Sequence, residues 1–317
     1  MNTGLTVVID NLNLLGTLCG PNDQNLEELS AIFSSPVRTR GNEIVFESSD
    51  DELRLIFRNL MDRLKEIALK EDVVTKNQIH SIFSSLESGE DSDIKTFRES
   101  IIKISGGIKR VYPRNNKQSE YIRFMSSHDL IFSTGPAGTG KTYLAVAHAL
   151  MELMSGKKRK IILTRPVVET GENLGFLPGD LTQKLSPYLR PLYDAMEDLI
   201  EPETFEKLME NGRIEVAPLA YMRGRSMKNC YIVLDEAQNT TIEQMKMFLT
   251  RLGEGSRAVV TGDLTQIDLA SPEKSGLSNA IKILKGIEDI AVTEFTSADV
   301  VRHPLVKKII DAYEKNK

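Results

Sequence analysis

The sequence has few cysteines, no excess of positive charge and no long apolar run. Its two cysteines, Cys19 and Cys230, lie far apart and lack metal-ligand spacing. This spacing offers no disulfide framework, and a reducing, cytoplasmic environment is the simplest expectation. Because neither a basic region nor a long apolar stretch follows Met1, we expect no signal peptide and no membrane span.

Positive charge is in slight deficit. The 317 residues include 40 lysines and arginines against 45 aspartates and glutamates, which gives a formal net charge of −5. Any contact with a nucleic acid must therefore come from local basic patches, since the whole molecule has no positive field. The hydrophobic fraction of 40% and the charged fraction of 27% are typical of a globular protein.

Changes in composition along the chain predict three parts. We expect a small α/β module at 1–85, an acidic linker with a basic hairpin at 86–112, and the main domain at 113–317. In the module we expect short strands around one helix, followed by two further helices. The expected strands are 6–9, 37–40 and 43–46, and the expected helices are 24–33, 50–70 capped by Asp50, and one from Thr75, which forms a capping box with Gln78.

From Gln118 onward, apolar runs alternate with helical patterns, which predicts a parallel sheet with helices on both faces. The expected strands are 130–134, 160–164, 214–217, 230–234, 257–261 and 291–295. The expected helices are 118–126, 142–154, 181–199, 203–210, 240–252, 275–285 and a short one at 304–313. The fold class is therefore α/β.

A glycine-rich stretch between a strand and a helix fits the phosphate-binding pattern G-x-x-x-x-G-K-[ST]. Its residues are Gly135, Pro136, Ala137, Gly138, Thr139, Gly140, Lys141 and Thr142. The glycines allow a tight turn, and the loop N–H groups and the helix start favour an anion. Lys141 would reach the β and γ oxygens of a nucleotide, and Thr142 would offer a hydroxyl to Mg²⁺. The alternative is a glycine-rich turn with an incidental lysine.

Two carboxylates follow a buried strand in Asp235–Glu236, at the edge of the sheet where ligands bind in this fold class. Asp235 could hold Mg²⁺ through water, and Glu236 could act as general base on an attacking water. The alternative is that Asp235 caps a turn and Glu236 is merely exposed.

Two further residues follow strands of the same sheet. Gln266 carries an amide that could sense the γ-phosphate or orient water. Arg302, beyond the last strand, could stabilise the charge of a transferring phosphoryl group. A surface arginine that caps a helix is the alternative for Arg302.

The order of these motifs resembles the first motor core of superfamily 1 helicases, a RecA-like P-loop core, and the intervening sequence resembles the PhoH family. The segments that carry this resemblance are Thr164–Pro166, Gly175–Asp180, Pro187–Asp194, Met222–Arg225 and Val301–Leu305. It covers residues 110–317. The module before it resembles the KH-like piece of the same family, although its Gly-x-x-Gly loop is not visible.

The resemblance implies a cytoplasmic ATPase of RNA metabolism and phosphate starvation, with ATP and Mg²⁺ bound. It also implies ring-shaped homo-oligomers and cooperation with a small endoribonuclease. Gln118 matches the glutamine that reads adenine in such proteins. Neither an Asn-Lys-x-Asp base reader nor an acidic quartet typical of a PIN nuclease is present, so we expect ATP rather than GTP and no nuclease activity.

RNA contacts are predicted at three arginines. Arg165 ends a strand and matches a helicase position that contacts the nucleic acid strand, while Arg223 and Arg225 lie in a loop before the next strand. Phosphate contacts from these residues would be independent of base sequence and sensitive to salt. The alternative for each is an oligomer contact or an ion pair.

Three functions compete at this stage. The first is an RNA-dependent ATPase, and the second is a nucleotide-gated scaffold that presents an endoribonuclease through the 1–85 module. The third is a phosphotransferase, which Glu236 and Gln266 disfavour because both suit water as the acceptor. The sequence carries one motor core, so we expect any mechanical work to need neighbouring copies or a partner.

Overall fold

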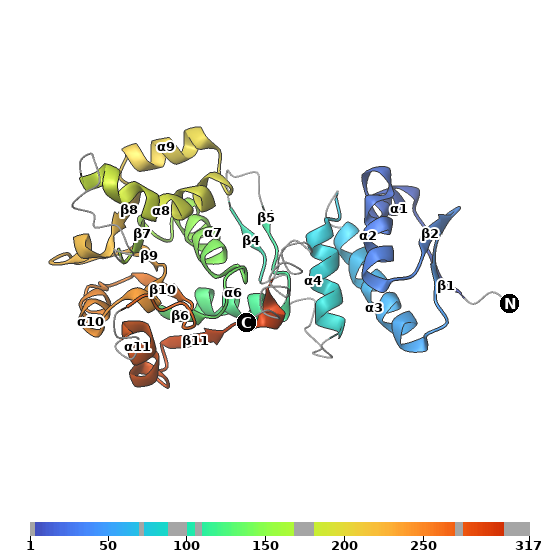
Figure 1. Cartoon of the computed structure of the whole chain (residues 1–317). Coiled ribbons are helices and arrows are strands. Elements are labelled where there is room, and N and C mark those ends of the chain that lie inside the picture. The colour runs from blue at the N-terminus through green and yellow to red at the C-terminus, as the bar shows by residue number, and fades with distance from the viewer. Residues whose placement is uncertain are drawn as a thin grey trace. The chain divides into compact units, whose positions relative to one another are not determined.

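The computed structural model describes residues 4–69, 73–87, 100–104, 110–167, 181–269 and 275–300. The chain divides into two compact units (Figure 1). They are Met1–Ile101 with Tyr112–Ser119, and Ile102–Val111 with Glu120–Lys317. The domain boundaries expected from composition, at 85 and 113, stay predictions. The expected helix at 304–313 and the expected turn at Gly106–Gly107 lie outside the described residues.

The first unit is a three-stranded antiparallel sheet with helices, and it has its own hydrophobic core. Its elements are β1 (Gly4–Val8), α1 (Leu12–Cys19), α2 (Gln24–Phe33), β2 (Val37–Arg40), β3 (Glu43–Glu47), α3 (Asp51–Ala68) and α4 (Lys76–Glu87). The strand order is β1-β3-β2. The predicted small α/β module is thus present, and its KH likeness stays a prediction.

The expectation of one helix before β2 is wrong, because α1 precedes α2. Asn11 caps α1 by accepting a hydrogen bond from the Asn13 N–H at 2.8 Å. The helix has only eight residues and contains Gly16, so its apolar residues show no clear helical period. The predicted caps at Asp50 and Thr75 are confirmed by side-chain hydrogen bonds at the starts of α3 and α4.

The second unit is built on a six-stranded sheet in which every pairing is parallel. The strand order is β11-β6-β10-β9-β7-β8. The strands are β6 (Leu130–Thr134), β7 (Lys160–Arg165), β8 (Ile214–Pro218), β9 (Cys230–Leu234), β10 (Arg257–Gly262) and β11 (Ile290–Glu294). The predicted strands and the α/β class are confirmed. A separate pair, β4 (Ile102–Lys103) and β5 (Arg110–Val111), is antiparallel, as expected for the basic hairpin.

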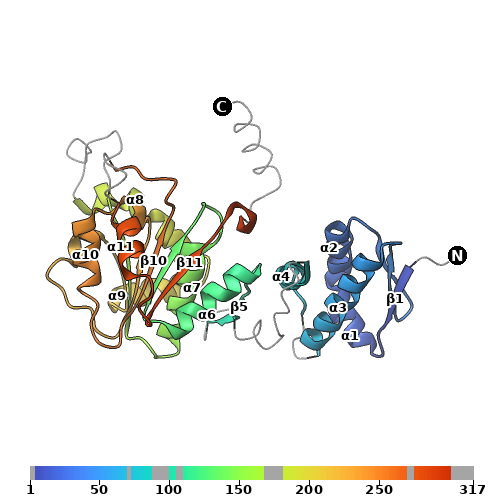
Figure 2. The ribbon, with the colours of Figure 1, turned by 90° about the horizontal axis from the view of Figure 1, so that it is seen from below.

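Helices cover both faces of this sheet (Figures 1 and 2). One face carries the core that includes residues of α6 (Asn116–Ser127), α7 (Lys141–Met154), α8 (Leu181–Glu197) and α9 (Pro202–Glu210). The other face carries residues of α10 (Ile242–Leu249) and α11 (Gly276–Leu284). Alternate residues of each central strand enter opposite cores, as with Ile131 and Phe132 of β6. Both faces of the sheet are apolar and covered by helices, so a polar ligand would bind at the edge formed by the strand ends.

The strand order brings three polar segments together at the carboxyl edge of the sheet. The loop after β6 leads into α7, and β10 separates β6 from β9. The residues after β9 and β10 therefore lie beside the glycine-rich loop, although some 100 residues of chain separate them from it.

Candidate active site

The glycine-rich loop turns sharply between β6 and α7. Gly135 has a φ of 138°, and a Cβ placed on it would overlap the backbone oxygen of Phe295. Gly140, with a φ of 84°, is the residue that precedes the first turn of α7. Both backbone conformations favour glycine. The loop therefore ends at a helix start, whose N–H groups suit an anion.

Lys141 begins α7 and is nearly buried, with an exposed fraction of 8%. Its ammonium donates hydrogen bonds to the backbone oxygens of Gly135 at 2.6 Å and Pro136 at 2.8 Å. Burial lowers the pKa of this ammonium, and the charges of Asp263, Asp235 and Glu236 oppose that shift. The lysine is thus a cation held inside the loop by acceptors that phosphate oxygens could replace.

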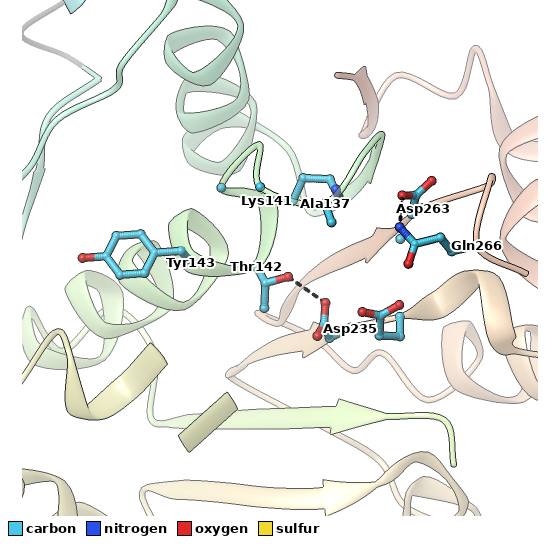
Figure 3. Close-up of a pocket in the computed structure, with 11 residues that line it drawn as sticks. Ala137, Lys141, Thr142, Tyr143, Asp235, Asp263 and Gln266 are labelled. Atoms are coloured by element: carbon cyan, nitrogen blue, oxygen red, sulfur yellow. Dashed lines mark hydrogen bonds between the residues drawn. The ribbon is translucent and has the colours of Figure 1, made fainter. Parts of the chain in front are cut away.

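Asp235 joins the loop to the neighbouring strands. Its Oδ1 accepts hydrogen bonds from the hydroxyls of Thr142 and Thr261, each at 2.7 Å. The Thr142–Asp235 bond is drawn in Figure 3. A hydroxyl and a carboxylate are oxygen ligands of the kind that Mg²⁺ takes together with nucleotide phosphates. These two side chains fit the predicted magnesium role.

Glu236 follows Asp235 in a left-handed backbone conformation, with a φ of 52°. A non-glycine residue there costs about 1–3 kcal/mol, and such strain is common at functional sites. Its Oε1 lies 3.5 Å from an Nη atom of Arg165, and its Oε2 accepts a hydrogen bond from Gln238 at 2.5 Å. The carboxylate is therefore restrained at both oxygens.

Gln238 and Asp263 complete the site, and sequence reasoning assigned neither a role. Gln238 is fully buried. Its side-chain amide donates hydrogen bonds to Glu236 and to the Gln266 backbone oxygen, and it accepts one from the Asp263 N–H. Burial raises the pKa of the Asp263 carboxyl, but hydrogen bonds from Thr265 and Gln266 outweigh this and lower it. The Gln266 amide donates to Asp263 at 2.7 Å. The loop after β10 is thereby tied to Glu236.

These segments enclose a cavity of about 260 Å³. Figure 3 shows the carboxylates and Gln266 on one side and the start of α7 on the other, with the Tyr143 ring extending away from them. The lining residues are Ala137, Gly138, Gly140, Lys141, Thr142, Tyr143, Asp235, Glu236, Gly262, Asp263 and Gln266. The structure therefore brings together most of the residues that the motifs predicted.

Some predicted residues stand elsewhere. Gln118 belongs to the first unit, and its amide oxygen accepts a hydrogen bond from the Arg114 N–H at 2.7 Å. Its adenine-reading role stays a prediction. Arg302 lies outside the described residues. Arg225 makes two bonds to Glu215, at 2.6 and 2.8 Å, so the structure gives it an ion pair.

Comparison with known proteins identifies the family. The model of PhoH-like proteins matches residues 110–314. This chain belongs to the PhoH family. A PhoH-like protein of Bacillus subtilis is 48% identical over 300 residues, which are 94% of this chain and 93% of that protein. A PhoH-like protein of Mycobacterium tuberculosis is 46% identical over 303 residues, with coverage of 96% and 86%.

More distant matches share only part of the chain. Protein PhoH of Escherichia coli is 43% identical over 205 residues, which are 64% of this chain and 58% of that protein. Among solved structures, the helicase MrfA bound to DNA matches with a TM-score of 0.34 and 12% identity, over 60% of this chain and 28% of that one.

Among the described residues, no helix combines the length and the apolar character needed to cross a membrane. Within the same ranges, no three histidine, cysteine or carboxylate side chains gather as a metal site.

Proposed function

We propose that this PhoH-family protein hydrolyses ATP in the cavity beside α7 and couples hydrolysis to single-stranded RNA. The observation that carries the proposal is the 2.7 Å bond between Thr142 and Asp235, with Lys141 and Glu236 lining the same cavity. It joins the phosphate loop to the carboxylate strand, as nucleotide hydrolysis in this fold class requires.

Each side chain has a role in this proposal. Lys141 exchanges its loop carbonyls for phosphate oxygens, and the N–H groups at the start of α7 bind the same anion. Thr142 and Asp235 would hold Mg²⁺, which would neutralise phosphate charge. Glu236 accepts a proton from the attacking water, while Gln238 orients the Glu236 carboxylate. Gln266 lines the same cavity and would sense the γ-phosphate.

The RNA part of the proposal rests on the exposed surface beyond β7 and β8. Arg165 ends β7, and a short 3-10 turn, η3 (Leu219–Met222), follows β8 and leads to the exposed Arg223. Tyr221 in that turn is 50% exposed. An exposed tyrosine two residues before an exposed arginine suits single-stranded nucleic acid, because bases can stack on the ring and phosphates can bind the cation.

The test is the ATPase rate with and without single-stranded RNA, with the mass of the protein in solution measured alongside. We expect RNA to raise the rate, and Glu236→Gln to abolish turnover while ATP binding is retained. Turnover by Glu236→Gln at the wild-type rate would refute the catalytic assignment. The absence of RNA stimulation at low salt would refute only the RNA part.

A second candidate function, the nucleotide-gated scaffold for an endoribonuclease, is favoured by the separate core of the first unit. A module with its own core can recognise a partner while the ATPase unit changes state. Pull-down from extract with ATP and without nucleotide separates the two functions. Capture of an endoribonuclease only in one nucleotide state would favour the scaffold.

A further inference from the structure

The Glu236 carboxylate lies between two opposing contacts. Its Oε1 lies 3.5 Å from Arg165, at the end of β7, and its Oε2 accepts a bond from Gln238, whose amide is tied to the loop after β10. In the sheet, β7 and β10 are on opposite sides of β9. The phosphate loop follows β6, which lies beyond β10. Arg165 therefore holds one carboxylate oxygen from the β7 side, and Gln238 holds the other from the β10 side, on which the phosphate loop lies.

We propose that Arg165 is a positioning residue that restrains Glu236 until an RNA phosphate replaces the carboxylate as acceptor of the guanidinium N–H groups. This inference rests on the proposed function, and it names how RNA would regulate the same site. With RNA on Arg165, the contact to Glu236 Oε1 is lost while the Gln238 bond remains. The carboxylate then keeps only the contact on the β10 side, nearer the phosphate loop, where it meets the attacking water.

The accessibility and strength of the ion pair fit such an exchange. The side chains of Arg165 and Glu236 are 22% and 35% exposed, so solvent and a phosphate can reach the pair. The distance of 3.5 Å is longer than that of a well-formed charge-assisted bond, and the guanidinium also donates to the Tyr188 backbone oxygen at 3.3 Å. A pair of this exposure changes an equilibrium by about fivefold at most. An RNA phosphate has high charge density and two oxygens that can accept from the guanidinium together. It can therefore displace Glu236 from Arg165.

The first experiment compares Arg165→Ala with wild type in steady-state ATP hydrolysis, with and without a single-stranded oligouridine. Without RNA, we expect kcat of the variant to rise by about two- to fivefold with the KM for ATP unchanged, and RNA to raise it no further. The matched control is Arg159→Ala, an exposed arginine that precedes the same strand, about 20 Å from its carboxyl end. An RNA-free rate of Arg165→Ala that is unchanged or lower overturns the inference.

The second experiment needs no turnover and serves if Arg165→Ala fails to fold. Coupling between two sites is reciprocal, so weakening the pair from the Glu236 side must strengthen RNA binding. We expect Glu236→Gln to bind the oligouridine about two- to fivefold more tightly than Asp268→Asn, in fluorescence anisotropy without nucleotide. Asp268→Asn removes the same charge from the loop after β10. Equal RNA affinities of the two variants overturn the inference.

The outcomes separate this inference from the proposed function. If RNA fails to stimulate wild type, the RNA part of the proposed function is wrong, and the RNA-free rate of Arg165→Ala still decides whether the arginine restrains Glu236. If Glu236→Gln turns over normally, the catalytic assignment is wrong, and with it the restraint on catalysis.

Discussion

Replacing the buried Gln238 tests the link between Glu236 and the loop after β10. Gln238→Met keeps nearly the same volume but removes three side-chain hydrogen bonds, to Glu236, Asp263 and Gln266. The Asp263 N–H and the Gln266 oxygen would lose a partner. Only the Asp263 N–H bond is buried, and a buried polar group without a partner costs about 1–3 kcal/mol, so the free energy of unfolding should fall by about 1–3 kcal/mol.

The same variant should also lose activity, because Glu236 would keep only its contact with Arg165. A hydrogen bond to a charged group contributes about 1.5–3 kcal/mol, which corresponds to a fall in kcat of about tenfold to a hundredfold. Urea unfolding followed by circular dichroism measures the first effect, and steady-state ATP hydrolysis measures the second. Because loss of a positioning bond acts on the reaction step, the KM for ATP should change little.

The matched control is Gln244→Met in the exposed first turn of α10. Gln244 takes part in a capping box with Thr241, so its replacement should cost no more than about 1 kcal/mol and leave kcat unchanged. A Gln238→Met protein with wild-type stability would show that the buried amide bonds contribute nothing. One with lowered stability and wild-type kcat would show that Gln238 does not position Glu236.

Three further predictions follow from other contacts. Thr261→Val removes one of the two hydroxyls on Asp235, so the unfolding free energy should fall by about 1.5–3 kcal/mol and the Mg²⁺ concentration for half-maximal hydrolysis should change. Arg225→Met should lower the thermal midpoint and leave RNA affinity unchanged, because Arg225 bonds Glu215; an RNA affinity loss without destabilisation would contradict this. Burial, aided by the nearby positive charges, lowers the pKa of His148 from 6.5 to about 3. The unfolded state therefore takes up this proton first, and stability should fall as pH drops from about 6.5 toward 3, less steeply in His148→Gln when urea midpoints are compared at several pH values.

Much of the second unit could be predicted because its strands are short apolar runs that end in polar residues. Each of its six strands lies within a residue of the expected range, since strands buried on both faces are nearly continuous in apolar character. The phosphate loop was equally clear, because glycine, lysine and threonine at fixed spacing have few other uses. Strand order could not be predicted, since the residues of a parallel strand do not show which distant strand of the chain pairs with it.

The residues that sequence reasoning missed act through partners distant in the chain. Thr261 meets Asp235 because Val260 pairs with Leu234 in the parallel ladder, and one step further along the two strands brings the hydroxyl to the carboxylate. Gln238 was visible in the motif after β9, but its partners Asp263 and Gln266 come from the loop after β10. Neither contact can be read from one segment alone.

One physical signal could still have pointed to Thr261. It follows three consecutive apolar residues in β10, and the structure leaves it fully buried. A buried hydroxyl costs free energy unless a hydrogen bond satisfies it, so Thr261 was a candidate for a contact with a polar group at the sheet edge. The edge already contained Asp235, the nearest carboxylate after a neighbouring strand. In this chain the Thr261 hydroxyl distinguishes the anchored Asp235 from Glu236, whose contacts with Arg165 and Gln238 leave it 35% exposed.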